Sequence, residues 1–282
     1  MSFFSALFSN PFLQYAIAAG FLASIASGFM GSFVVAKKIS SISGSISHSI
    51  LGGIGLSIFL NYKFSLSWFD PILGAFVAAI LASLLIGWIH LKHRGKEDAA
   101  IATIWSTGMG LGVIFIALVP SYSGDFTHFL FGNILVVTKT HLFLLFAFDL
   151  LIIFILSINY RKFLSICFDE KTAYLQKINV SFMYLLLLIL ISFSIVLLIQ
   201  IIGIILVIAL LTIPATIASL YNKKLYKIMF ISSILSFIFI FLGIGISYDL
   251  NIPPGACIAI LSALAYVLCL LFAKKAHPKM RR

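Results

Sequence analysis

Two titratable side chains, His48 and Asp149, lie inside long apolar stretches, where each could act on an ion. His48 sits among serines in ISGSISHSILGGIG, and a neutral imidazole there can bind Zn²⁺, Mn²⁺ or Fe²⁺. Asp149 lies in HLFLLFAFDLLIIFIL with no basic residue nearby in sequence. A polar group at bilayer depth is costly, so both are candidate ligands or relay groups on a translocation path. The alternatives are a structural histidine bonded to a neighbouring helix and a protonated aspartic acid that donates between helices.

The stretches around these residues belong to a chain suited to a lipid bilayer. Hydrophobic residues make up 62% of its 282 residues and charged residues 10%, whereas soluble domains are about half apolar and about a quarter charged. Backbone groups in hydrocarbon must be paired within each segment, which favours helices. We expect an all-α polytopic membrane protein, a single domain over residues 1–282 with about nine transmembrane or re-entrant helices. Their approximate bounds are 12–36, 44–60, 70–91, 99–119, 140–158, 180–199, 201–220, 228–247 and 255–273.

The positions of the basic residues predict an orientation. With the segments alternating and the N-terminus outside, all 19 Lys and Arg residues except Lys63 and Lys139 fall on the inner side. Cytoplasmic loops carry such an excess, so we expect the N-terminus outside and the C-terminus inside. The net charge of +11 therefore reflects membrane orientation, and we expect no nucleic-acid partner. Only Gln200 and its neighbours separate the sixth and seventh segments, which leaves open a partial or re-entrant helix there.

Two stretches between the apolar segments stand out. Residues 120–139 are predicted to lie outside, as a short helix or re-entrant element over a cavity or as an interfacial loop. Residues 159–178 form the longest inner loop, and FDEKTAYLQKI within it begins with acidic residues suited to a helix N-terminus. This loop is either a docking helix for a soluble partner or a simple connector. His90 and His93, beside Lys92 and Arg94, are predicted to be solvated.

No motif of a soluble enzyme is present in the sequence. It contains neither a Walker-type loop nor a Gly-x-Ser-x-Gly elbow nor a zinc-protease helix. We therefore expect no catalytic residues and no bound cofactor. If ATP energises transport, a separate polypeptide must hydrolyse it.

Six segments in order resemble the permease subunits of the ABC-3 family, the zinc, manganese and iron uptake ABC transporters. The resemblance runs from about residue 12 to 273, and the external string THFLFGNIL is its most specific part. The segments are GSFVVAKKISSISGSISHSILGGIGL, EDAAIATIWSTGMGLGVIFIAL, THFLFGNIL, FDEKTAYLQKINV, IQIIGIILVIALLTIPATIASL and SYDLNIPPGACIAIL.

The resemblance implies roles for particular residues. His48 would contribute to metal coordination or passage. The family usually has an acidic residue one helical turn earlier, but this position is Gly44 here. Either Asp149 or another group would replace that carboxylate, or the ion would bind only transiently. The loop from Asp169 to Ile178 would be the coupling helix that meets the ATPase, with Asp169, Glu170, Ala173 and Ile178 as its coupling residues. Its family-typical Gly-Ile ending is Lys177-Ile178 in this chain. Pro214 is expected to kink the seventh segment.

The resemblance also implies partners and a mechanism. They are a cytoplasmic ABC ATPase, an external metal-binding protein and a second permease copy or paralogue, all at a bacterial cytoplasmic (inner) membrane. The divalent metal (zinc, manganese or iron) is the transported substrate, moved by alternating access. Three other readings stay open: an ATP-independent ion-coupled transporter or channel, a membrane scaffold without transport, and an ABC importer of an organic chelate.

Overall fold

The computed structural model describes residues 3–66, 68–93, 95–119, 132, 134 and 137–276. These residues are predominantly helical, as the apolar segments predicted. The helices are α1 (Phe3–Ser9), α2 (Pro11–Lys37), α3 (Ser40–Phe64), α4 (Pro71–Lys92), α5 (Glu97–Ala117), α7 (Lys139–Phe168), α8 (Glu170–Leu175), α9 (Val180–Tyr221), α10 (Leu225–Leu250) and α11 (Pro254–Ala276).

Several of the long helices begin at a polar residue that caps their free N–H groups. Asn10 accepts a hydrogen bond from the Phe12 N–H at 3.0 Å, and Asp70 accepts one from the Leu73 N–H at 2.9 Å. A proline follows each of these two caps, where its fixed φ suits the first helical turn. Thr138 and Asn179 cap α7 and α9 in the same way. Local sequence thus determines where these spans start.

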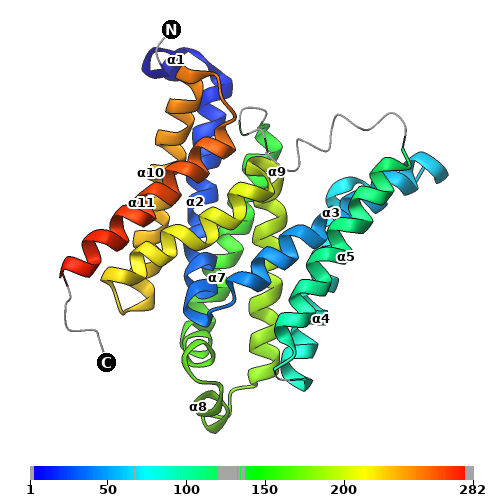
Figure 1. The fold of residues 1–282 in the computed structure, drawn as a ribbon, viewed down its shortest axis with the longest axis vertical. Coiled ribbons are helices and arrows are strands. Elements are labelled where there is room, and N and C mark those ends of the chain that lie inside the picture. The colour runs from blue at the N-terminus through cyan, green and yellow to red at the C-terminus, as the bar shows by residue number, and fades with distance from the viewer. Residues whose placement is uncertain are drawn as a thin grey trace.

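Among the described residues, eight helices are long and apolar enough to cross a membrane. The predicted sixth and seventh segments are the two parts of α9, which departs from helical backbone angles at Gly203 (φ 77°, ψ 162°). The chain changes direction there without a loop, as Figure 1 shows. Pro214 keeps helical backbone angles, so the break falls at Gly203 and not at the proline. The number of membrane crossings and the orientation in the bilayer remain predictions.

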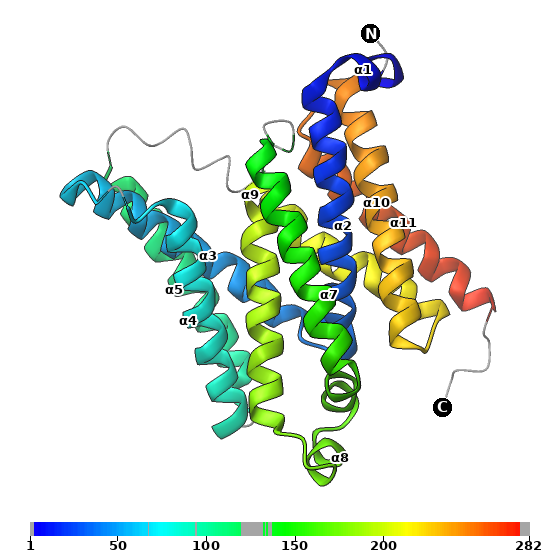
Figure 2. The same cartoon turned by 180° about the vertical axis from the view of Figure 1, so that it is seen from behind.

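The helices form two groups on either side of α9. Helix α3 packs against α4 and α5 in one group, and α2 packs against α10 and α7 in the other. Helix α9 contacts members of both groups and, with α2, is among the most buried spans. Figure 2 shows the same arrangement from behind, with α1 and the short helix α8 at opposite ends of the molecule.

Most of the external stretch 120–139 lies outside the described residues, and so does its predicted role above a cavity. Gly132 is described and adopts a left-handed backbone (φ 66°). A Cβ at this position would overlap the backbone of Ile202 and Gly203. The stretch therefore lies against the break in α9 at this point, and glycine is needed on both sides of that contact.

Candidate functional site

The serines around His48 satisfy their own hydroxyl groups. Ser43, Ser47 and Ser49 each donate to a carbonyl three or four residues earlier on α3, at 2.8–2.9 Å. Ser45 instead donates to the Ile101 carbonyl of α5 at 2.9 Å. These hydroxyl groups are buried, and each already donates a hydrogen bond to a backbone carbonyl. The main contribution of the small serine side chains is therefore to allow close packing of α3 against its neighbours.

Helix α5 approaches α3 at two pairs of glycines, Gly52 with Gly108 and Gly55 with Gly112. A Cβ on Gly52 would lie 2.8 Å from the Gly108 carbonyl oxygen, and one on Gly55 would lie 2.7 Å from that of Gly112. Real side chains do not tolerate such distances, so the close approach depends on glycine. This register brings the side chain of Trp105 over His48.

The imidazole of His48 stacks on the indole of Trp105. The ring centroids are 4.4 Å apart, and the ring planes are inclined by 16°. His48 is partly buried, and its Nδ1 is buried without a hydrogen-bond partner among the described residues. The alternative role of His48, a structural hydrogen bond to a neighbouring helix, is thus not seen at Nδ1 among the described residues. A ring nitrogen left without a partner is costly to bury, and in the tautomer that leaves its lone pair free it is available to a metal ion.

Gly44, one helical turn before His48, also faces Trp105. A Cβ on Gly44 would lie 3.3 Å from the indole Cζ3 and 3.6 Å from Cη2. Trp105 thus covers the position from which a side chain on Gly44 would extend. Trp105 could not be identified from the sequence, because no local pattern indicates which helix packs over His48.

Asp149 on α7 is 3% exposed, and neither of its carboxyl oxygens has a hydrogen-bond partner among the described residues. The interhelical hydrogen bond considered for it is therefore not seen there. Helix α7 packs mainly on α2 and α9, whereas α3 packs mainly on α5 and α4. No group of three or more His, Cys, Asp or Glu side chains suited to a metal lies among the described residues. The roles of His48 and Asp149 as metal-path residues remain predictions.

The loop predicted to couple with an ATPase contains the short helix α8, and Asp169 caps it. Asp169 Oδ1 accepts from the Lys171 N–H at 3.0 Å, and Oδ2 accepts from the Thr172 hydroxyl at 2.6 Å. These two interactions, the hydroxyl first, lower the pKa of the Asp169 carboxyl. The cap keeps its negative charge at neutral pH, where it favours the helix N-terminus.

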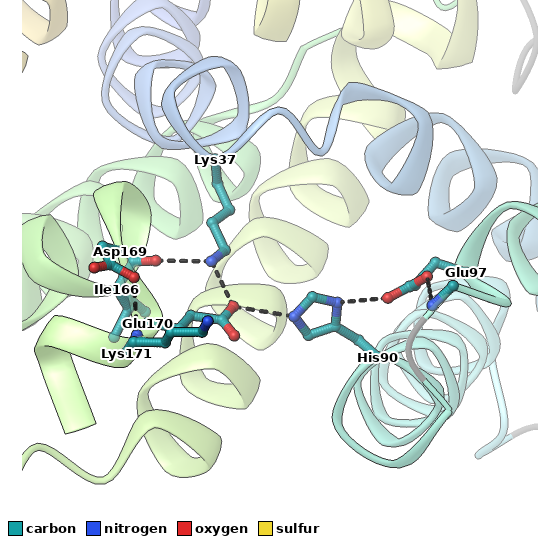
Figure 3. Close-up of polar contacts among 8 residues, drawn as sticks. Lys37, His90, Glu97, Ile166, Asp169, Glu170 and Lys171 are labelled. Carbon is teal, nitrogen blue, oxygen red and sulfur yellow. Dashed lines mark hydrogen bonds and ion pairs between the residues drawn. The ribbon is translucent and has the colours of Figure 1, made fainter.

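Glu170 turns inward from α8 and joins a polar cluster with Lys37, His90 and Glu97, shown in Figure 3. Lys37 Nζ lies 2.6 Å from Glu170 Oε1 and also donates to the Ile166 carbonyl at 2.7 Å. His90 Nε2 lies 3.1 Å from Glu170 Oε1, and its Nδ1 lies 3.3 Å from Glu97 Oε1. Four residues from α2, α4, α5 and α8 are thus linked in one chain, which we call the Glu170 cluster.

Hydrogen bonds within the Glu170 cluster stabilise the charged form of the Glu170 carboxyl. Burial raises the pKa of the Glu170 carboxyl, but the hydrogen bonds from Lys37 and His90 outweigh burial, and the pKa falls below its ordinary value. His90 lies between two carboxylates, with Nε2 within hydrogen-bond distance of Glu170 and Nδ1 within ion-pair distance of Glu97. The prediction that His90 is simply solvated is wrong, because its side chain is 21% exposed and bridges two carboxylates.

The other residues of the loop divide into buried and exposed sets. Ala173 is fully buried, and its carbonyl accepts from the Ile178 N–H at 3.1 Å. Lys177 ends α8 in the left-handed conformation (φ 59°), which is why glycine is the expected residue there. Tyr174 and Leu175 are 75% and 80% exposed. Glu170 and Ala173 therefore face the protein, while Tyr174 and Leu175, absent from the predicted set, present the free surface.

Taken together, the eight candidate spans among the described residues and the short helix bonded to their ends define a multi-pass membrane protein. The chain belongs to the ABC 3 transport family, which matches residues 9–273.

Relatives of known sequence and structure agree with this assignment. A probable metal transport system membrane protein of Chlamydia pneumoniae is 46% identical over 91% of this chain and 87% of its own length. The manganese transport system membrane protein MntC of Listeria innocua is 33% identical over 98% of this chain and 95% of its own. The structure of PsaBC from Streptococcus pneumoniae in complex with Fab superposes with a TM-score of 0.83 at 32% identity, covering 95% of this chain and 94% of that one.

Proposed function

We propose that this chain is the membrane-spanning permease subunit of an ATP-driven importer of a divalent metal, with Mn²⁺ as the first candidate cargo. The observation that carries the proposal is the match, over nearly the whole chain, to permeases named for manganese or metal transport. The chain itself does no covalent chemistry. It supplies a path for the ion and two conformations with different ion affinity.

Within this proposal, the polar side chains inside the bundle serve the ion. His48 offers its unpartnered nitrogen to the metal, and Asp149 offers a carboxyl that nothing among the described residues engages. The two lie on α3 and α7, which both pack on α9 but have different main neighbours. Because no group of three or more His, Cys, Asp or Glu side chains suited to a metal lies among the described residues, each would contact the ion separately along the path. Weak binding at each position suits a conduit, because a tightly held ion does not leave.

The end of the molecule that carries α8 would receive the ATPase. Tyr174 and Leu175 present an exposed aromatic and aliphatic surface, and Glu170 fastens the same helix to α2 and α4. A movement of α8 would thus pull on two spans at once. The remaining partners are a second permease, either a copy or a paralogue, and an external metal-binding protein.

Uptake into proteoliposomes that contain this chain and its partner ATPase tests the proposal, with the metal-loaded binding protein outside. We expect uptake of Mn²⁺ that stops when the ATPase carries a hydrolysis-deficient substitution. Uptake that persists without hydrolysis would instead establish an ion-coupled transporter or channel, for which Asp149 and His48 would be the proton relay. Parallel assays with Zn²⁺, Fe²⁺ and a metal chelate identify the cargo.

A further inference from the structure

The stack of Trp105 on His48 differs in geometry from the other ring contacts made by histidines among the described residues. Its planes are inclined by 16°, compared with 67° for Trp88 and His93, which meet edge to face. His90 and Tyr184 are tilted by 32°. Trp105 therefore covers a face of the His48 imidazole and leaves the ring edge, where both nitrogens lie, uncovered by the indole.

Gly44 and Trp105 fit together as a pair. Positions 44 and 48 lie one turn apart on the same face of α3, so a side chain at 44 would reach the ion side of His48. The Cβ of any such side chain would press on the indole at 3.3 Å. The indole would have to shift by a few tenths of an ångström to admit a side chain at 44, and with glycine it stacks on His48 without that shift.

The electronic effect of the stack favours metal binding. An imidazole binds a metal in the plane of its ring, through a lone pair that the indole does not block. Binding a divalent cation makes the ring electron-poor, and the electron-rich face of an indole attracts such a ring, as in a cation–π contact. The indole also restricts the rotation of the His48 side chain, which reduces the entropy lost when an ion binds.

We propose that Trp105 is the positioning and selectivity residue of the ion path, holding His48 so that one imidazole nitrogen takes a divalent transition metal without a carboxylate from position 44. An imidazole nitrogen suits Zn²⁺ and Fe²⁺ best, and Mn²⁺ less, because Mn²⁺ shares with Mg²⁺ and Ca²⁺ a preference for oxygen ligands. A stacked imidazole without a neighbouring carboxylate therefore discriminates against the abundant hard cations. The proposal rests on the proposed function and adds a residue and a basis for selectivity to it.

Fluorescence of Trp105 itself tests the contact without changing either partner. The sequence has three tryptophans, so the full-length Trp68→Phe/Trp88→Phe chain in proteoliposomes retains Trp105 alone. We expect Mn²⁺ and Co²⁺, whose open d shells quench indole emission at short range, to quench Trp105 in a saturable way, and Mg²⁺ to have no effect. Adding His48→Ala should abolish the quenching. Saturable quenching that survives His48→Ala, or no quenching by either metal, overturns the proposal.

Transport by the complete importer supplies the second measurement. Trp105→Ala should raise the KM for Mn²⁺ about 2- to 5-fold with little change in kcat, the range of a cation–π contact at an exposed site, because the Trp105 side chain is 38% exposed. Trp105→Phe should recover part of the loss, and Trp88→Phe, the matched control, should leave KM unchanged. If Trp105→Ala leaves the KM unchanged while uptake still depends on ATP, the proposed role of Trp105 is wrong, but the proposed function is not contradicted. If the importer with the natural chain takes up no metal, the proposed function is wrong.

Discussion

Lys37, at the end of α2, lies 2.6 Å from Glu170 in α8, and both side chains are largely shielded from solvent. The short helix predicted to meet the ATPase is therefore bonded directly to a membrane span that packs on α9 and α10. The same Glu170 oxygen contacts His90 of α4. Because breaking one member of a buried charge cluster leaves the others uncompensated, these contacts define the first two predictions.

Replacing Glu170 with Gln should lower the thermal stability of the purified chain at neutral pH, by about 1–3 kcal/mol for a charged hydrogen-bond partner lost from a shielded site. The pKa of Glu170 is lower in the folded chain than in the unfolded one. Its stabilising effect is thus complete above the unfolded pKa, which is about 4.3, and disappears as pH falls through the folded value.

The measurement is the difference in Tm between the natural chain and Glu170→Gln from pH 7 down to pH values below the ordinary glutamate range. That difference should shrink on the acid side, because a protonated Glu170 resembles glutamine. A difference that stays constant across the whole range would show that the carboxylate charge does not stabilise the cluster.

Replacing His90 with Ala should uncouple α8 from α4 and α5, because His90 bridges Glu170 and Glu97. We expect ATP-driven uptake to fall about 2- to 30-fold, the range that about 0.5–2 kcal/mol of coupling free energy allows. Binding of the ATPase, measured by co-purification, should persist because Tyr174 and Leu175 are untouched. His93→Ala, at an exposed position on the same helix end, is the matched control and should transport normally.

The long apolar segments made the spans predictable from sequence. The boundary between the sixth and seventh segments was harder to place from sequence. It was predicted at Gln200, whereas the helix breaks at Gly203, where no polar loop marks the turn. Pro214 was the stronger sequence signal for a kink, yet a proline can stay in a helix when neighbouring helices satisfy the freed carbonyl. The break in α9 lies at Gly203 because the backbone angles there are available mainly to glycine.

The contacts around the candidate site could not be predicted, because they depend on how helices pack. His90 was interpreted as solvated from its neighbours Lys92 and Arg94, but its partner Glu170 is 80 residues away in sequence. Trp105 reaches His48 only because Gly108 and Gly112 let α5 approach α3 closely. All of these residues are present in the sequence, but the sequence pattern does not indicate which helices are neighbours.

Replacing Lys177 with Gly should stabilise the end of α8. Lys177 has φ 59°, a conformation that costs an L-residue roughly 1–2 kcal/mol, against about 0.5–1 kcal/mol of extra chain entropy lost by glycine. The expected net gain is about 0.5 kcal/mol, seen as slower hydrogen exchange at the Lys177 and Ile178 amides, which bond back to α8. Lys171→Gly, inside the same helix, should speed exchange instead, and a similar effect of both substitutions would contradict this account.

Replacing Gly203 with Ala should destabilise the chain and disturb the path between the two parts of α9. Gly203 has φ 77° and ψ 162°, a region essentially restricted to glycine, and forcing another residue into it costs about 1–3 kcal/mol. Gly132 approaches the same backbone so closely that a Cβ would overlap it, so Gly132→Ala should act in the same direction. Gly110→Ala is the matched control, because nothing lies within 4 Å of a Cβ at this helical position, and it should leave Tm unchanged or raise it slightly. Thermal melting of the three purified variants checks the order, and a Gly203→Ala chain as stable as Gly110→Ala would show that the break in α9 does not depend on glycine.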